Sequence, residues 1–203
     1  MRSLDRVYHC PESDVLPLDR SKRDGQRRAM IKNLLMGGTE PLATKSMQDT
    51  VSVISHYEAE IVEKLSLEAG TEHHDFVFSA GGFQIGCDRL VISRDCRAAA
   101  LFWFRLGKPK PETYNPATLE ARALAAMLFA EFPTLGICHA VVIQPLLPNH
   151  VAMAEITPDT ASEILPMIKE AQKKRVGKAA GYWCGTCFLT EICSEYKTMK
   201  GKP

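Results

Sequence analysis

Three cysteines close to the C-terminus form a C-x2-C-x5-C cluster: Cys184, Cys187 and Cys193. A fourth, Cys10, lies between His9 and Pro11 near the N-terminus. Thiolates two residues apart suit a shared metal, because a short turn places both sulfurs on one side. If all four bind one centre, closing so long a loop stabilises the fold by about 5 kcal/mol, comparable to the net stability of a domain. The cysteines therefore predict a metal clip that joins residues 8–12 to 182–195.

The spacing of the four cysteines also bears on the metal. Zinc and an iron–sulfur cluster both accept four thiolates. Zinc modules usually use two local C-x-x-C pairs, whereas here one ligand is remote, which favours a [4Fe–4S] cluster over Zn. Three alternatives remain: His9 replaces Cys10 as the ligand, the thiols are unligated, or Cys184 and Cys187 form a redox pair. The three other cysteines lie in apolar, strand-like stretches and are expected to be inert core thiols: Cys87, Cys96 and Cys138.

The composition limits the class of protein. The 203 residues fit a single domain spanning 1–203, and the formal charge of +1 excludes a strongly basic protein. Any nucleic-acid binding must therefore come from local clusters of cations. The sequence shows neither a signal-peptide core after Met1 nor an apolar run long enough to cross a bilayer, so we expect an intracellular, cytoplasmic protein with reduced thiols. An odd total of seven cysteines also argues against a complete disulfide framework.

Hydrophobic periodicity and turn residues predict the order of elements. Helical spacing predicts a helix over 30–36, stopped by Gly37-Gly38, and a longer one from 46 to a cap at Gly70. Asn115-Pro116 and Thr157-Pro158 are typical of helix starts. The remaining predicted elements are strands over 76–79, 83–93, 98–106, 136–144 and 150–155, and helices over 115–131 and 157–175. The αβββαβ order predicts a mixed α/β core rather than a doubly wound parallel sheet.

These features together resemble the RecB-like branch of the PD-(D/E)XK nucleases, in the members with a four-cysteine [4Fe–4S] cluster. That group includes AddB-type helicase–nucleases, CRISPR-associated RecB-like exonucleases and phage-encoded relatives. One cysteine before a proline precedes their core, as Cys10-Pro11 does here, and three follow it as C-x2-C-x5-C. Residues 6–13 are similar to the family's opening helix. The resemblance implies a restriction-endonuclease-like fold, with the cluster on Cys10, Cys184, Cys187 and Cys193.

The catalytic motifs of that family are only partly present. Asp88, followed by Arg89, keeps a carboxylate where the family has a metal ligand. Trp103 and Arg105 stand where the family's D-x-K motif has an acid and a lysine, and Ala29 stands where it has a histidine. The helix motif Q-x-x-x-Y is likewise absent from 118–122. The resemblance therefore implies a degenerate site in which Asp88 is a catalytic remnant, because tryptophan cannot bind Mg²⁺ and arginine cannot act as a base.

We therefore expect a nuclease-fold protein that binds DNA without sequence preference and does not hydrolyse it. The cations expected to contact phosphate follow the central strand or belong to the basic run at 20–28: Arg27, Arg28, Arg105, Lys108 and Lys110. A first alternative is an active Mg²⁺- or Mn²⁺-dependent DNA exonuclease with displaced residues. Its candidates are other acids, together with His73 or Lys108: Glu72, Asp75, Asp95 and Glu112. A second alternative is a nuclease-mimicking inhibitor that binds a host or phage protein.

Overall fold

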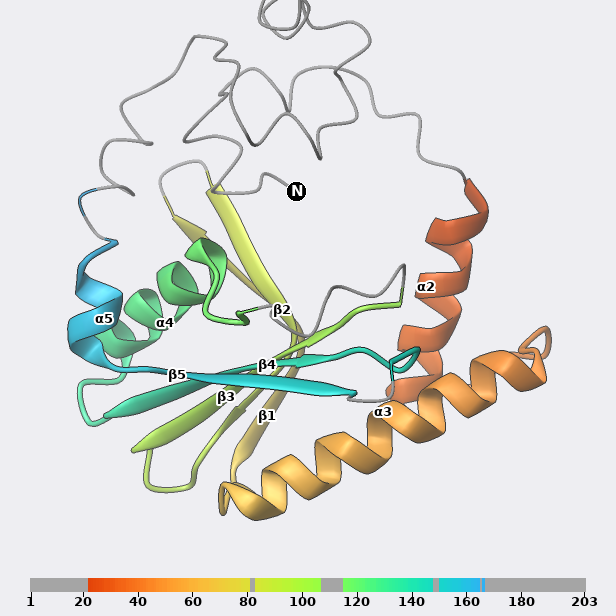
Figure 1. The fold of residues 1–203 in the computed structure, drawn as a ribbon, viewed down its shortest axis with the longest axis horizontal. Helices are drawn as coiled ribbons and strands as arrows, with labels where there is room; N and C mark the ends of the chain where they lie inside the picture. Colours follow the sequence, from red (N-terminus) through yellow and green to blue (C-terminus); the bar gives the residue numbers. More distant parts are fainter. Residues whose placement is uncertain (1–21, 81–82, 107–114, 148–149, 165, 167–203) are drawn as a thin grey trace, which may run out of the picture.

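The structure is a computed structural model that describes residues 22–80, 83–106, 115–147, 150–164 and 166. The predicted metal clip, with Cys10, Cys184, Cys187 and Cys193, lies outside these residues. The described elements are α2 (Lys22–Leu35), α3 (Lys45–Lys64), β1 (Thr71–Ala80), β2 (Phe83–Ile92), β3 (Ala98–Phe104), α4 (Leu119–Glu131), β4 (Ile137–Ile143), β5 (Val151–Ile156) and α5 (Pro158–Ser162). Figure 1 shows their arrangement around one twisted sheet.

The strands form one five-stranded sheet in the order in which they follow along the chain. The β1–β2, β2–β3 and β4–β5 pairs are antiparallel, whereas β3 and β4 are parallel. A parallel pair needs a crossover connection, and α4 supplies it between β3 and β4. The predicted αβββαβ order and the mixed α/β class are therefore confirmed.

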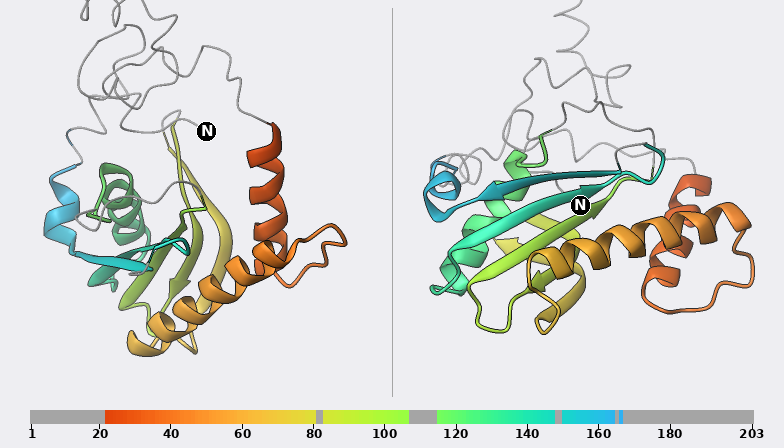
Figure 2. Two further views of the ribbon diagram at one scale, coloured as in Figure 1. Left: turned by 45° about the vertical axis from the view of Figure 1, so that its right-hand side comes forward. Right: turned by 60° about the horizontal axis from the view of Figure 1, so that its bottom comes forward.

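Helices cover both faces of the sheet (Figures 1 and 2). On one face α4 and α5 pack against the strands, in a core cluster that includes Leu101 and Leu124. On the other face a second cluster joins the strands to α2 and α3, and it includes Ile31, Ile54 and Phe102. Neighbouring residues of β3 thus point into opposite cores and are fully buried. We call these the α4 face and the α3 face.

The predicted helix boundaries differ from the structure at several points: α2 begins at Lys22 rather than at residue 30, and α5 ends at Ser162, inside the predicted range 157–175. Helix α4 begins at Leu119, and its N-cap is Thr118, whose hydroxyl accepts from the backbone N–H of Ala121 at 3.2 Å. Asn115 instead accepts from the N–H of Ala117 at 2.9 Å, in a turn before the helix. Helix α3 ends at Lys64 rather than near Gly70, because Leu65 already closes its last turn. The predicted Thr157 cap is confirmed: its hydroxyl and that of Thr160 form a capping box.

The described cysteines are free thiols. Cys87 and Cys138 are buried, as predicted, and Cys96 is half-buried in the turn between β2 and β3. Burial raises the pKa of Cys138 to about 12, and burial also raises the pKa of Cys87. Both buried thiols therefore stay protonated and unreactive near neutral pH. None of the helices in the described part of the chain has the length and apolar character needed to cross a membrane.

Candidate active site

Asp88 lies near the middle of β2 and is held by contacts from two other elements. Its Oδ2 accepts a hydrogen bond from the backbone N–H of Phe104 at 2.7 Å, at the end of β3. Its Oδ1 forms an ion pair with Nζ of Lys32 at 2.8 Å. The Asp88 side chain is 19% exposed, so both contacts are partly shielded from water. One carboxylate oxygen is therefore fixed by the sheet, and the other faces α2.

Asp75 of β1 brings a second carboxylate to the same lysine. Its Oδ1 forms a hydrogen-bonded ion pair with Nζ of Lys32, and its side chain is 51% exposed. The backbone of Asp75 has a φ of 47°, in the left-handed region that aspartate tolerates better than most side chains. Asp75 was one of the acids predicted from the sequence as replacements for the missing ligand, and the structure brings it to the same lysine as Asp88.

The regular pleat of β2 is interrupted at Asp88. Strand side chains three positions apart normally point to opposite faces. Cys87 and Leu90 nevertheless both belong to the cluster on the α4 face. Between them, Asp88 reaches α2 through Lys32 and Arg89 reaches α3 through Glu58, so two successive side chains leave on the same side of the sheet.

The facing strand is interrupted at the same level. Within the described strands, the β1–β2 register runs from His74 opposite Arg89 to Phe76 opposite Cys87, without a pair between Asp75 and Asp88. The left-handed φ of Asp75 falls at this gap. Because both strands depart from the pleat together, the register on either side of the gap is unchanged. The gap turns the two carboxylates toward α2.

Lys32 comes from the last turns of α2 and was not predicted as a site residue. Nothing in the local sequence distinguishes it, since a lysine on a helix is usually solvated. Burial lowers the pKa of Lys32, but hydrogen bonds and charge attraction from Asp75 and Asp88 outweigh that effect and leave the pKa raised. Lys32 is therefore a cation in this site and not a base.

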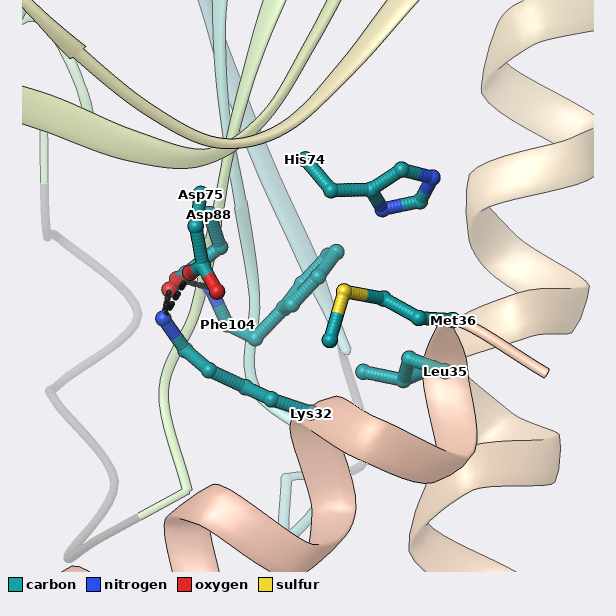
Figure 3. Close-up of a pocket in the computed structure, with 7 residues that line it drawn as sticks. All are labelled: Lys32, Leu35, Met36, His74, Asp75, Asp88 and Phe104. Carbon is teal, nitrogen blue, oxygen red and sulfur yellow. Dashed lines mark hydrogen bonds and ion pairs between the residues drawn. The ribbon is translucent and has the colours of Figure 1, made fainter. Parts of the chain in front are cut away.

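The three charged side chains form one side of a small open pocket (Figure 3). Its empty volume, which includes space open to solvent, is about 210 Å³. The other side is mainly apolar, with Leu35 and Met36 at the end of α2, Phe104 and His74. His74 and its neighbour His73 lie in β1, which begins before the strand predicted over 76–79.

The residues at the D-x-K positions, Trp103 and Arg105, lie at the end of β3. Trp103 packs against the core cluster on the α4 face, and its Nε1 donates to the carbonyl oxygen of Gly86 at 3.0 Å. Arg105 directly follows β3, where its backbone N–H donates to the carbonyl oxygen of Ile143 at 2.9 Å, and it is half-buried. Neither residue lines the pocket, and the site is built without them.

The other predicted residues lie at several distinct places. Arg27 is half-buried and Arg28 is exposed, both on α2. Asp95 lies in the turn after β2, where it accepts from the hydroxyl of Ser93 at 2.7 Å, away from the pocket. Glu72 forms an ion pair with Arg89 instead of joining Asp75. Lys108, Lys110 and Glu112 lie outside the described residues.

The site offers two carboxylates to a metal ion. In the described part of the chain, no group of three or more His, Cys, Asp or Glu side chains is arranged to hold one. Mg²⁺ commonly uses only one or two carboxylates, because waters and substrate phosphate complete its shell. Oδ1 of Asp75 and Oδ1 of Asp88 converge on one ammonium group, which shows that a small cation fits between them. The donor set therefore fits Mg²⁺ or Mn²⁺ bound together with a phosphate.

No protein-family profile matches the chain, and no curated protein sequence matches it significantly. Among solved structures, the chain is similar to LHK-Exo, an alkaline exonuclease from Laribacter hongkongensis, with 18% sequence identity over 97% of this chain and 90% of that chain and a TM-score of 0.36. The structure of LHK-Exo in complex with dAMP gives 16% identity over 97% and 94% of the two chains and a TM-score of 0.37. At these values the similarity carries no argument about activity.

Proposed function

We propose that this chain is a nuclease-fold protein that binds nucleic acid and hydrolyses its phosphodiester bonds with Mg²⁺ or Mn²⁺. The observation that carries the proposal is that Asp75 and Asp88, from neighbouring strands, both pair with Lys32. Hydrolysis was not expected from the sequence, because tryptophan replaces the second metal-binding acid and arginine replaces the lysine. Asp75 offers a second carboxylate beside Asp88 and answers the first of these two objections.

Each of the three residues has a separate role in the proposal. Asp88 and Asp75 hold the divalent cation, which supplies charge stabilisation at the phosphate and lowers the pKa of bound water. Lys32, which keeps its proton, donates to a phosphate oxygen or to the attacking water and orients it. The contact from the Phe104 N–H keeps Asp88 in one orientation before substrate arrives.

Cations near the site support binding to a phosphate backbone. Arg28 precedes Lys32 by four residues on α2 and therefore lies one helical turn away on the same side. Arg28 is exposed, so its guanidinium is accessible to a neighbouring phosphate. The proposal includes the other predicted cations, namely Arg27, Arg105, Lys108 and Lys110. Contacts of this kind position a nucleic acid without reading its sequence, so the expected partner is DNA of any sequence.

The test is degradation of end-labelled single- and double-stranded DNA with Mn²⁺ or Mg²⁺, with EDTA as the metal-free arm. Asp88→Asn and Asp75→Asn are each expected to abolish metal-dependent degradation. Asp49→Asn, at an exposed position of α3, is the matched control and is expected to behave as wild type. Intact substrate with the wild-type protein under all these conditions contradicts the hydrolytic proposal.

A second candidate is a protein that binds DNA without cutting it, as was expected from the sequence. It is favoured by Trp103, which occupies the position of the acid in the D-x-K motif and packs against the core cluster on the α4 face. Binding that weakens steeply with salt, without degradation, supports this candidate. Absence of both binding and degradation favours the remaining alternative, an inhibitor that mimics a nuclease and engages a host or phage protein.

The proposal also includes a [4Fe–4S] cluster on Cys10, Cys184, Cys187 and Cys193, with Zn as the alternative metal. Its support is the spacing of the four cysteines and the resemblance to iron–sulfur members of the RecB-like branch. The role proposed for the cluster is structural, since a centre bound by all four cysteines would tie together residues near both ends of the chain.

A further inference from the structure

Arg89 directly follows Asp88 and links three elements on the α3 face. Its Nη1 lies 2.9 Å from Oε2 of Glu58 in α3, and its Nη2 lies 2.6 Å from Oε2 of Glu72 in β1. The side chains of Arg89 and Glu58 are 18% and 6% exposed. A planar guanidinium that reaches two carboxylates in this way has little freedom to rotate. Arg89 is therefore fixed to a helix and to the neighbouring strand.

The direction of Arg89 is incompatible with an unbroken pleat through Asp88. If β2 alternated regularly back from Arg89, Asp88 would point to the α4 face, because successive side chains point to opposite faces. Asp88 instead reaches Lys32 and the N–H of Phe104. The interruption of β2 therefore lies between Arg89, which is bound to α3, and Asp88, which is bound to α2.

We propose that Arg89 is a positioning residue for Asp88: its contacts with Glu58 and Glu72 hold the interrupted pleat that turns the Asp88 carboxylate toward Lys32 and Asp75. Glu72 extends this effect to the facing strand, because it lies three residues before Asp75 on β1 and is bound by the same guanidinium. Arg89 does not line the pocket, so it acts on the site only through the backbone of β2. The inference refines the proposed function, since it names what orients the metal-binding carboxylate.

The backbone amide of Phe104 provides a readout that needs neither metal nor activity. This N–H donates to Asp88 Oδ2 at 2.7 Å, so its proton resonance reports the position of that carboxylate. In ¹H–¹⁵N spectra, the Asp88→Ala variant shows where the Phe104 amide resonance lies when this hydrogen bond is absent. Arg89→Met and Arg89→Lys are expected to move the Phe104 resonance toward that of Asp88→Ala. Arg97→Met, which removes an arginine that is 81% exposed, is the matched control and is expected to leave it unchanged.

Arg89→Met leaves Glu58 without its cation, and a variant that unfolds for this reason is replaced by the double variant Arg89→Met, Glu58→Gln. Removing both members of a buried pair is better tolerated than removing one. The inference is overturned if Asp88→Ala shifts the Phe104 resonance but Arg89→Lys and the double variant both leave it at the wild-type position. A loss of thermal stability alone does not support it, since Arg89 also ties α3 to the sheet.

Mn²⁺ binding separates this inference from the proposed function. If both hold, Arg89→Met lowers Mn²⁺ affinity by about 10- to 100-fold, as the loss of outer-shell partners does at other metal sites. If Asp88→Asn leaves Mn²⁺ affinity unchanged, the proposed metal site fails, and the Phe104 resonance still decides whether Arg89 positions Asp88. If Asp88→Asn abolishes Mn²⁺ binding but Arg89→Met and Arg97→Met both bind Mn²⁺ with wild-type affinity, the metal site is supported and the positioning role of Arg89 is contradicted.

Discussion

Asp75 and Asp88 face each other across β1 and β2, at a gap between backbone pairs that are otherwise in register. Both carboxylates reach the same ammonium group, Nζ of Lys32. Two negative charges so close would repel each other, and the lysine compensates for this repulsion. A divalent cation is also able to compensate for the repulsion between the two carboxylates. The same pair of charges that binds Lys32 therefore suits the metal that the proposed hydrolysis needs.

Replacing Lys32 separates its role as a hydrogen-bond donor to the reacting phosphate from its role in compensating the two carboxylates. Lys32→Met keeps most of the length of the side chain and removes its charge. We expect Mn²⁺-dependent degradation of DNA to fall by about 100-fold or more, because an oriented donor to the reacting phosphate is lost. Mn²⁺ affinity is expected to be unchanged or stronger, because no ammonium group competes with the metal. Rates and Mn²⁺ affinity measured beside Lys64→Met, on exposed α3 surface, check both outcomes.

The fold follows from local sequence patterns more directly than the site does. Turn residues such as Gly37 and the Thr157-Pro158 start were identified correctly because their conformations depend on nearest neighbours. The start of β1 was missed: the strand begins at Thr71, among polar and charged residues that pairing with β2 holds in extended form. Hydrophobic alternation does not mark a strand of this kind.

The site depends on contacts between residues that are distant in the sequence. Lys32 and Asp75 are 43 positions apart, and no periodic pattern relates them. Asp88 was identified because a motif contains it, whereas Asp75 was one of several candidate acids. The choice among these acids depends on the interrupted pleat and on the left-handed φ of Asp75, and both are tertiary features.

Two glycines, Gly70 directly before β1 and Gly136 directly before β4, provide a test of close packing between backbone segments. A Cβ at Gly70 would lie 2.2 Å from the carbonyl oxygen of Ile92, so the backbone must shift to accept it. Gly70→Ala is expected to lower the free energy of unfolding by about 1–3 kcal/mol, as overpacking does elsewhere. A Cβ at Gly136 would lie 3.8 Å from the carbonyl oxygen of Arg97, an ordinary contact. Gly136→Ala is therefore the control, and urea denaturation that ranks the two variants equally contradicts the predicted clash.

The four cysteines are predicted to bind iron and sulfide. Protein purified without oxygen should be brown, with broad absorbance near about 400 nm from thiolate-bound iron. Cys10→Ser and Cys187→Ser should lower thermal stability by similar amounts, because each removes one ligand of the same clip. The control is Cys96→Ser, at a half-buried turn position outside the predicted ligand set. Colourless protein with stoichiometric zinc supports the zinc alternative, and an unchanged stability in Cys10→Ser contradicts the end-to-end closure.

Glu58 predicts the direction in which stability changes with pH. Burial raises the pKa of Glu58 from 4.5 to about 7, the positive charge of Arg89 opposes this shift, and the negative charge of Glu72 adds to it. Between about pH 4.5 and pH 7, Glu58 of the folded protein keeps a proton that Glu58 of the unfolded chain has released. The contribution of Glu58 to stability is therefore fully present below about pH 4.5 and is lost as the pH rises to about 7.

The variant Glu58→Gln isolates this contribution, because glutamine has nearly the same shape and does not titrate. Urea denaturation at several values between about pH 5 and pH 8 should show wild type losing stability relative to Glu58→Gln as the pH rises. The control is Glu63→Gln, an exposed glutamate on the same helix, for which the difference from wild type should not vary in this way. A stability difference between wild type and Glu58→Gln that stays constant over this range means that the attraction of Arg89 outweighs burial, and that Glu58 is already ionised in the folded protein.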